Sequence, residues 1–184
     1  ITLLPDPEFS HAHLLGALVA KLHRALVQGQ TTDIGVSYPQ HVSQPLTKRS
    51  LGAVLRLHGT PEALQRLMEE DWLKGMRDHT QVGELLPVPA NAQHRTVRRR
   101  QFKTNADRLR RRRMQRKGET AEQAAAAIPD TVERRPDLPF VQLRSSSTGQ
   151  SFCLCVEHGP LQPLPVAGAF NAYGLGHQAT VPWF

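Results

Sequence analysis

The sequence predicts an α+β protein, and two features of the residue pattern lead to this class. Over residues 1–90, strand-like and helical stretches follow in the order strand–helix–strand–strand–helix–strand, the split βαβ or ferredoxin-like (RRM-like) pattern. Over residues 91–184, further strand-like runs surround an arginine-rich helical stretch at about residues 105–117. We therefore expect a ferredoxin-like domain followed by a C-terminal α+β domain with an arginine-rich helix. Many unrelated functions use this fold, so it says little about function.

Two amphipathic helices are predicted in the first half of the chain. Ser10 is positioned to cap a helix that runs to about Val27, and leucines recur along this helix at helical spacing. Thr60 precedes Pro61, which suits the first position of a second helix. The large apolar residues of the second helix are expected to be Leu64, Leu67 and Trp72.

Four short strands are predicted beside these helices. Residues 1–4 form the end of one strand, and residues 34–38 form a β-branched run that Pro39 ends. Residues 54–58 alternate between apolar and polar side chains, and residues 81–88 form a further short apolar run. These strands complete the six elements of the ferredoxin-like pattern.

Two helix starts are predicted in the second half. Thr104 and Asp107 have the spacing of a capping box, and so do Thr120 and Gln123. The first helix is dominated by arginine and has almost no apolar face, so it must lie against solvent or a charged partner. The second helix should run through several alanines to Ile128.

Three strands are predicted around these helices. Residues 96–103 form a basic strand or extended segment. Residues 140–144 and 151–156 are strand-like and flank the Ser/Thr/Gly-rich residues 145–149, a composition typical of a hairpin loop.

The positive charge of the chain is concentrated in one internal strip. The formal net charge is +7, yet residues 94–117 contain twelve lysines and arginines against one acid, Asp107, a net +11. The rest of the chain therefore carries a net −4. Such a concentration indicates a polyanionic partner. A merely solvated basic helix is the alternative, but it would interleave acids for ion pairs, and this strip has only Asp107.

Composition excludes several classes of protein. No apolar run approaches the roughly 20 residues that span a bilayer, and no N-terminal stretch has the layout of a signal peptide, so no membrane partner is expected. Two cysteines are too few for a disulfide scaffold and make a reducing cytoplasm the expected compartment. No phosphate-binding glycine motif supports ATP-driven chemistry. The chain opens without Met inside an apolar run, so we expect a few residues to precede Ile1.

The sequence predicts no metal site and no cofactor. His11 with His13, and Cys153 with Cys155, are spaced too closely for the usual ligand pairs of structural zinc. In a strand the two cysteines share a face, which predicts two small buried side chains. No acidic cluster suits a two-metal phosphoryl site, so cleavage of a phosphodiester would proceed without metal.

The residues alone leave the kind of nucleic acid open. A helix reads DNA through its wide major groove, whereas the major groove of A-form RNA is generally too narrow for side chains. Aromatic residues make up only 5% of the chain, which favours structured nucleic acid over a long single strand stacked on aromatic platforms. His23 lies at the edge of the apolar stripe of the first helix. Histidine there is more often packed or exposed than catalytic, but it can exchange protons near neutral pH.

Seven short segments, taken in order, resemble one known family. They are KLH at 21–23, GVSYP at 35–39, RLRRR at 108–112, IPDTV at 128–132, LRSSSTGQ at 143–150, YGL at 173–175 and VPWF at 181–184. Together they resemble the CRISPR repeat-processing endoribonucleases of subtype I-F systems, the I-F branch of the Cas six family. The resemblance covers essentially the whole chain.

The resemblance implies both the fold and the reaction. It implies a ferredoxin-like N-terminal domain and a C-terminal part whose arginine-rich helix enters the major groove of an RNA hairpin. The substrate would be the repeat stem-loop of precursor CRISPR RNA, cut at the 3′ base of the stem without metal. The protein would then stay on the mature CRISPR RNA beside the other subunits of the type I-F effector complex.

The resemblance also implies the site residues. His23 and Ser145 would form the active pair, and Tyr173 would orient the histidine or bound the site. Arg99 and Gln101 would read base edges near the bottom of the stem. The other RNA-binding residues would be Phe152, stacked on the terminal base pair, Arg111, Arg112 and Arg116 on the phosphate-binding helix, and Arg108, Gln115, Ser147 and Thr148.

These residue types suit the implied chemistry. Attack by a ribose 2′-OH on the adjacent phosphate needs proton removal, a role that histidine can fill. Ser145 would hold the 2′-OH or the nucleotide in line. The products would be a 2′,3′-cyclic phosphate and a 5′-OH, and a hairpin lacking that 2′-OH should bind without being cut.

Some residues depart from the family pattern, and two other functions stay open. Gln115 stands where family members typically carry arginine, so one phosphate contact is expected to be absent. Arg100 and Arg113 are charged where apolar residues are expected, and could compensate. The alternatives are a non-cleaving hairpin-binding subunit of an effector complex and recognition of duplex DNA by the basic helix.

Overall fold

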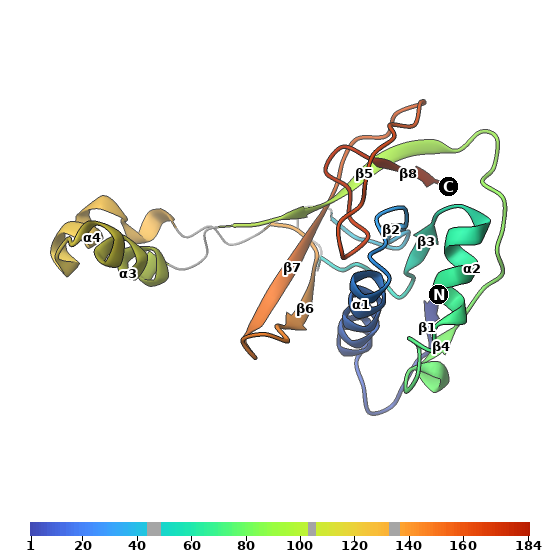
Figure 1. Ribbon diagram of the computed structural model, residues 1–184, viewed down its shortest axis with the longest axis horizontal. Helices are drawn as coiled ribbons and strands as arrows, with labels where there is room; N and C mark the ends of the chain where they lie inside the picture. Colours follow the sequence, from blue (N-terminus) through green and yellow to red (C-terminus); the bar gives the residue numbers. More distant parts are fainter. Residues whose placement is uncertain (44–48, 103–105, 133–136) are drawn as a thin grey trace. The chain divides into compact units, whose positions relative to one another are not determined.

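A computed structural model of the chain describes residues 1–43, 49–102, 106–132 and 137–184 (Figure 1). The chain forms two compact units. Residues 1–100 and 138–184 make the first unit, and residues 101–137 make the second. The functional division expected between residues 90 and 91 stays a prediction. The mixture of helices and sheets is that of an α+β protein, as expected.

The first part of the large unit has the predicted order of elements. It contains β1 (Thr2–Leu3), α1 (His11–Gln28), β2 (Gly35–Ser37), β3 (Arg56–His58), α2 (Pro61–Glu69), the short 3-10 helix η1 (Arg77–His79) and β4 (Thr80–Gln81). The run predicted as a strand over residues 81–88 leaves the ladder after Gln81, and its apolar side chains at Leu85 and Leu86 are exposed.

Both helices of this part begin where the sequence predicts. The Ser10 hydroxyl accepts a hydrogen bond from the His13 backbone N–H at 3.3 Å, and Thr60 caps α2 in the same way at 3.2 Å. Trp72 was expected within α2 but lies beyond its end at Glu69, and it is buried there.

The strands of this part pair in two short ladders. β1 pairs antiparallel with β4, and β2 pairs antiparallel with β3. An isolated antiparallel bridge between Thr2 and Val54 links β1 to the segment that precedes β3. The strands are therefore shorter than expected and lie in separate two-stranded sheets.

A four-stranded antiparallel sheet forms the rest of the large unit. Its strand order is β6-β7-β5-β8, with β5 (Gln93–Arg100), β6 (Phe140–Arg144), β7 (Ser151–His158) and β8 (Thr180–Trp183). β6 and β7 form the predicted hairpin. β5 begins three residues before the expected start, and the four-residue strand β8, which contains Pro182, was not predicted.

Helix α1 covers this sheet by packing on β6 (Figure 1). Its leucine stripe is buried, with Leu18 and Leu22 almost completely inaccessible. At Gly16 a Cβ atom would lie 2.8 Å from the Gln142 carbonyl oxygen of β6. Glycine therefore allows the close approach that fixes the depth of α1 on the sheet.

Two partly buried histidines, His158 at the end of β7 and His58 at the end of β3, have lowered pKa values. The His158 ring stacks on the His41 ring with centroids 3.6 Å apart, and both ring nitrogens of His158 are buried without a hydrogen-bond partner among the described residues. Burial lowers the pKa of His158 to about 3, with further lowering from His41 and Arg95. Burial likewise lowers the pKa of His58 to about 3. Both imidazoles are therefore neutral in the folded protein near pH 7.

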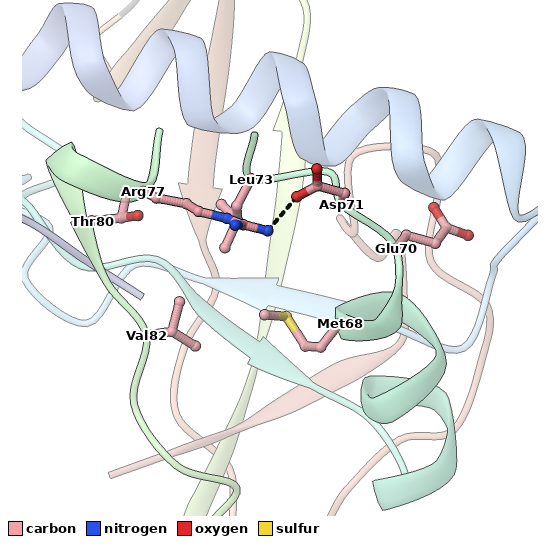
Figure 2. A pocket seen from close by; sticks show the side chains of 7 residues that line it. All are labelled: Met68, Glu70, Asp71, Leu73, Arg77, Thr80 and Val82. Carbon is pink, nitrogen blue, oxygen red and sulfur yellow. Dashed lines mark hydrogen bonds and ion pairs between the residues drawn. The ribbon is translucent and has the colours of Figure 1, made fainter. Parts of the chain in front are cut away.

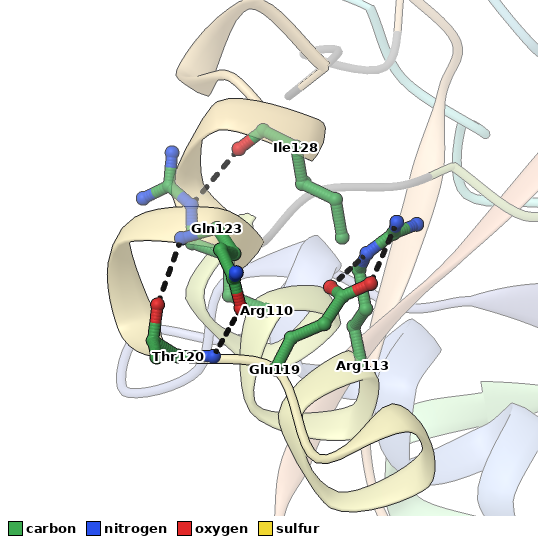
Figure 3. A network of polar contacts seen from close by, with 6 residues as sticks. All are labelled: Arg110, Arg113, Glu119, Thr120, Gln123 and Ile128. Carbon is green, nitrogen blue, oxygen red and sulfur yellow. Dashed lines mark hydrogen bonds and ion pairs between the residues drawn. The ribbon is translucent and has the colours of Figure 1, made fainter.

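The small unit is a pair of helices. It contains α3 (Ala106–Lys117), α4 (Ala121–Ala127) and the 3-10 helix η2 (Asp130–Val132). The predicted capping box of α4 is confirmed, because Gln123 N–H donates to the Thr120 hydroxyl while the Gln123 side chain accepts from Thr120 N–H (Figure 3). Thr104, expected to cap α3, lies outside the described residues. Among the described helices of both units, none is long and apolar enough to cross a membrane.

Candidate active site

A pocket of about 330 Å³ in the large unit gathers all three residues expected to be catalytic. The pocket is lined by residues of helix α1, of strands β5, β6 and β7, of the β6–β7 loop and of the segment before β8. Its described lining consists of Ala20, His23, Arg24, Arg99, Leu143, Arg144, Ser145, Ser146, Ser147, Phe152 and Tyr173.

The backbone of a distant segment orients His23. Its Nδ1 lies 2.8 Å from the carbonyl oxygen of Ala172, 149 residues away in sequence. A carbonyl oxygen only accepts hydrogen bonds, so Nδ1 carries a proton and donates it. In the neutral imidazole, Nε2 is then left with a free lone pair. His23 thus has the tautomer that a general base needs.

The Tyr173 ring holds the imidazole from its face. The two ring planes are nearly parallel, at 7°, with centroids 4.1 Å apart. Stacking and the Nδ1–H bond restrict the rotation of the imidazole about two different axes. Tyr173 therefore lies where a residue that orients the histidine would lie.

A tight turn fixes Ala172 and Tyr173 in place. The Asn171 side-chain oxygen accepts hydrogen bonds from the N–H groups of Tyr173 and Leu175, at 2.8 and 3.2 Å. Gly174 adopts φ +69°, a left-handed conformation that favours glycine. A Cβ atom there would lie 2.3 Å from Val36 Cγ2, so the turn closes directly on β2.

Ser145 begins the hairpin loop on another side of the pocket. Its hydroxyl accepts from Thr148 N–H at 3.3 Å and lies 3.2 Å from the Ser147 hydroxyl. Gly149, at φ +66°, closes the loop, and Arg144 Nε donates to its carbonyl at 2.8 Å. The loop is therefore held by its own hydrogen bonds, which place the Ser145 hydroxyl at the pocket.

Arg99 lies between two aromatic rings of the pocket. Its guanidinium carbon is 5.8 Å from the Phe152 ring centroid and 5.7 Å from the Tyr173 ring centroid. Both distances are within the range of cation–π attraction. The two rings thus hold Arg99 at the lining while its N–H donors remain available to a ligand.

The neighbours of Arg99 on β5 already have partners. Arg98 and Arg100 both pair with Glu157 of β7, at 2.5 and 3.3 Å. Arg95 donates two hydrogen bonds to the Gly159 carbonyl. The compensation of Arg100 for a lost phosphate contact stays a prediction.

Within the small unit, Arg110 joins α3 to the residues after α4. It donates to the carbonyl of Ile128 at 2.9 Å and pairs with Asp130 at 2.7 Å and with Asp107 at 3.2 Å. Figure 3 shows the Ile128 contact. Arg110 therefore stabilises the packing of the helix pair.

Arg113 has a comparable contact with the start of α4. Its Nε and Nη2 donate to the two carboxylate oxygens of Glu119, at 2.5 and 3.1 Å (Figure 3). This is the two-pronged geometry in which arginine pairs most strongly. Like Arg110, this arginine supports the helix pair, and its compensation for a missing phosphate contact stays a prediction.

The other RNA-binding residues expected in the small unit are exposed. Gln101 follows β5, and α3 exposes Arg108, Arg111, Arg112, Gln115 and Arg116. Arg108 makes a further contact of its own. In the large unit, Ser147 and Thr148 are exposed in the hairpin loop. Sequence reasoning could not separate these arginines from Arg110 and Arg113, because Asp130 and Glu119, which pair with those two, follow α3, and only Asp107 lies within the helix.

One of the two cysteines differs from the prediction that both are buried. Cys155 is buried, and burial raises the pKa of its thiol, but Cys153 is exposed. Cys153 pairs with exposed Gln142 near the hairpin end of β7, outside the buried part of the strand. Among the described residues, no three His, Cys, Asp or Glu side chains are grouped as metal ligands would be.

A second pocket, of about 310 Å³, lies beside α2 and η1 (Figure 2). Asp71 and Arg77 at its lining form an ion pair of 2.6 Å with each other. The two charges therefore satisfy each other, and the remaining lining is largely apolar. Its residues are Met68, Glu70, Asp71, Leu73, Arg77, Thr80 and Val82.

Comparison with known proteins matches the whole chain. The family model described as CRISPR-associated protein (Cas_Csy4) covers residues 1–184. A relative from Pseudomonas aeruginosa (strain UCBPP-PA14), named CRISPR-associated endonuclease Cas6/Csy4, is 48% identical over 100% of this chain and 97% of the relative. A relative of the same name from Escherichia coli (strain UTI89 / UPEC) is 45% identical over the same shares of the two chains.

Proposed function

Because the chain belongs to the Csy4 family of CRISPR-associated proteins, we propose that it is an endoribonuclease that processes precursor CRISPR RNA. Its substrate is the repeat stem-loop, which it cuts at the 3′ base of the stem without metal. The names of the two relatives support an endonuclease. The finer steps of this proposal rest on the residues of the large unit.

One observation carries the catalytic part of the proposal. His23 lines a pocket with its Nδ1–H directed at the Ala172 carbonyl, so that Nε2 is the basic nitrogen. Ser145 lines the same pocket with a hydroxyl held by the loop. A base and a positioning hydroxyl at one pocket are what 2′-OH attack requires.

The reaction is a transesterification within the RNA. His23 Nε2 takes the proton of the 2′-OH while the 2′-oxygen forms a bond to the adjacent phosphorus. The bond from phosphorus to the 5′-oxygen breaks, and that oxygen takes a proton from water. The products are a 2′,3′-cyclic phosphate and a 5′-OH. Ser145 orients the ribose, and Tyr173 keeps the imidazole in its plane.

Recognition of the hairpin uses both units. Arg99 and Gln101 read base edges, and Phe152 stacks on the terminal base pair. Arg111, Arg112 and Arg116 contact phosphates from α3, an assignment that their exposure supports. Arg108, Gln115, Ser147 and Thr148 add contacts to the RNA.

The proposal extends to the fold and to the fate of the product. Residues 1–90 form a ferredoxin-like domain, which the order of elements and the Thr2–Val54 bridge support. Residues 91–184 form the RNA-binding part. After the cut, the protein keeps the mature CRISPR RNA and joins the other subunits of the type I-F effector complex.

A cleavage assay in EDTA tests the proposal. Hairpin repeat RNA should be cut by the wild-type protein in EDTA, and a hairpin with a single 2′-deoxy residue at the cut should bind without being cut. Intact RNA with binding retained would mean a non-cleaving hairpin-binding subunit. Equal affinity for hairpin RNA and duplex DNA of the same sequence would contradict hairpin recognition.

A further inference from the structure

Arg24 places a positive charge at the catalytic pocket, and the sequence pattern does not single this residue out. It follows His23 directly, and with Ala20 and His23 it occupies one face of α1, because residues three and four apart on a helix are neighbours. Ala20 is small, so this face leaves room for a ligand between the helix and the β6–β7 loop. Arg24 itself is exposed to solvent.

The side chain of Arg24 has no partner within the described residues. Arg144 at the same pocket uses its Nε on the Gly149 carbonyl, and Arg99 is held between two rings. Arg24 makes no hydrogen bond or ring contact of this kind among the described residues. It is therefore the pocket cation most able to move onto a bound phosphate.

The pocket is cationic and lacks a compensating acid. Its described lining holds Arg24, Arg99 and Arg144 but no aspartate or glutamate. Such a lining concentrates positive potential where a phosphodiester would lie. An RNA phosphate would supply the missing negative charge.

The proposed reaction creates a specific need for such a cation. As the 2′-oxygen attacks, the phosphorus gains a fifth oxygen ligand and negative charge builds up on its non-bridging oxygens. His23 accepts the 2′-OH proton and cannot also neutralise those oxygens. A cation that contacts the oxygens on which charge develops lowers the barrier of phosphoryl transfer.

We propose that Arg24 is a further catalytic residue, which binds the non-bridging oxygens of the scissile phosphate and stabilises their charge in the transition state. This inference rests on the endoribonuclease function proposed above. Arginine stays protonated throughout, so Arg24 contributes charge and hydrogen bonds and transfers no proton. The proton balance given above is unchanged.

The test uses saturating enzyme and one turnover of hairpin repeat RNA. Arg24→Gln removes the charge but keeps a polar side chain, and should slow cleavage by about 10- to 100-fold. Its affinity for the uncleavable 2′-deoxy hairpin should change by less than about threefold. Arg24→Lys, which keeps the charge, should recover most of the rate. Arg66→Gln is the matched control, because Arg66 is an exposed α2 arginine that pairs with Asp33 and is not part of the pocket lining.

Each result decides between distinct explanations. If the wild-type protein cleaves the RNA and Arg24→Gln cleaves it at the same rate, the role of Arg24 is overturned and the proposed function is left intact. A loss of affinity with an unchanged rate at saturation also overturns it, because Arg24 would then only bind RNA. Wild-type protein that binds but does not cut overturns both proposals.

Discussion

The ion pairs of the small unit allow us to predict how steeply the RNA affinity falls as the salt concentration rises. In the described part of the small unit, four cations make no ion pair and no side-chain hydrogen bond: Arg111, Arg112, Arg116 and Lys117. If each of the four neutralises one phosphate, the RNA affinity should fall by about 50- to 150-fold between roughly 50 and 200 mM salt. If Arg112→Ala removes one of the four, the fall should shrink to about 20- to 40-fold.

Arg113 supplies the matched comparison one residue away. The double variant Arg113→Gln/Glu119→Gln removes an ion pair without changing the net charge. Because Arg113 is committed to Glu119, this variant should keep the wild-type salt slope. A partly exposed pair of this kind contributes at most about 1 kcal/mol to stability, so the fold should persist.

The assay is fluorescence anisotropy of the labelled 2′-deoxy hairpin at five or more salt concentrations. A thermal unfolding curve for each variant checks that both are folded. The reasoning is refuted if the Arg112→Ala and Arg113→Gln/Glu119→Gln proteins have the same slope. Equal slopes would mean that the ion pair seen in the protein does not decide which arginines meet RNA.

Three further predictions concern the catalytic pocket and the two partly buried histidines, His58 and His158. His23→Ala should abolish cleavage while changing hairpin affinity less than about threefold, as measured by single-turnover cleavage and anisotropy; normal cutting would exclude His23 as the base. Gly174→Ala should lower the free energy of unfolding in urea titrations by about 1–3 kcal/mol, because alanine is strained at a left-handed φ and its Cβ atom would clash with Val36. The same variant should cleave more slowly, because relief of the clash would displace the Ala172 carbonyl that orients His23. The pKa values of His58 and His158 are lowered in the folded protein, so below about pH 6.5 these histidines bind protons in the unfolded chain but not in the folded one. The free energy of unfolding should therefore be constant above about pH 6.5 and fall by up to about 2 kcal/mol for each histidine as the pH falls toward 5. Equal free energies of unfolding in urea at pH 7 and pH 5 would contradict this.

Local signals in the sequence predicted the helix starts correctly. Ser10, Thr60 and Thr120 each cap a helix as expected, because a cap depends on a few consecutive residues. The β6–β7 hairpin was predictable for the same reason. The end of α2 was not, since Trp72 is buried by tertiary packing beyond the helix.

Contacts between distant segments explain what the sequence could not predict. The carbonyl that orients His23 comes from Ala172, and no side-chain pattern marks a backbone oxygen. Glu157, on another strand, engages Arg98 and Arg100, and Glu119 engages Arg113. Composition therefore located the positive charge correctly but could not say which arginines are available to RNA.

The most direct test of the catalytic account is the chemistry of the cut ends. Hairpin repeat RNA is incubated with the wild-type protein in EDTA, and the masses of both fragments are measured. We predict a 2′,3′-cyclic phosphate on the upstream fragment and a 5′-OH on the downstream fragment. A 3′-OH with a 5′-phosphate would contradict the account, because it would mean attack by water in place of the 2′-OH.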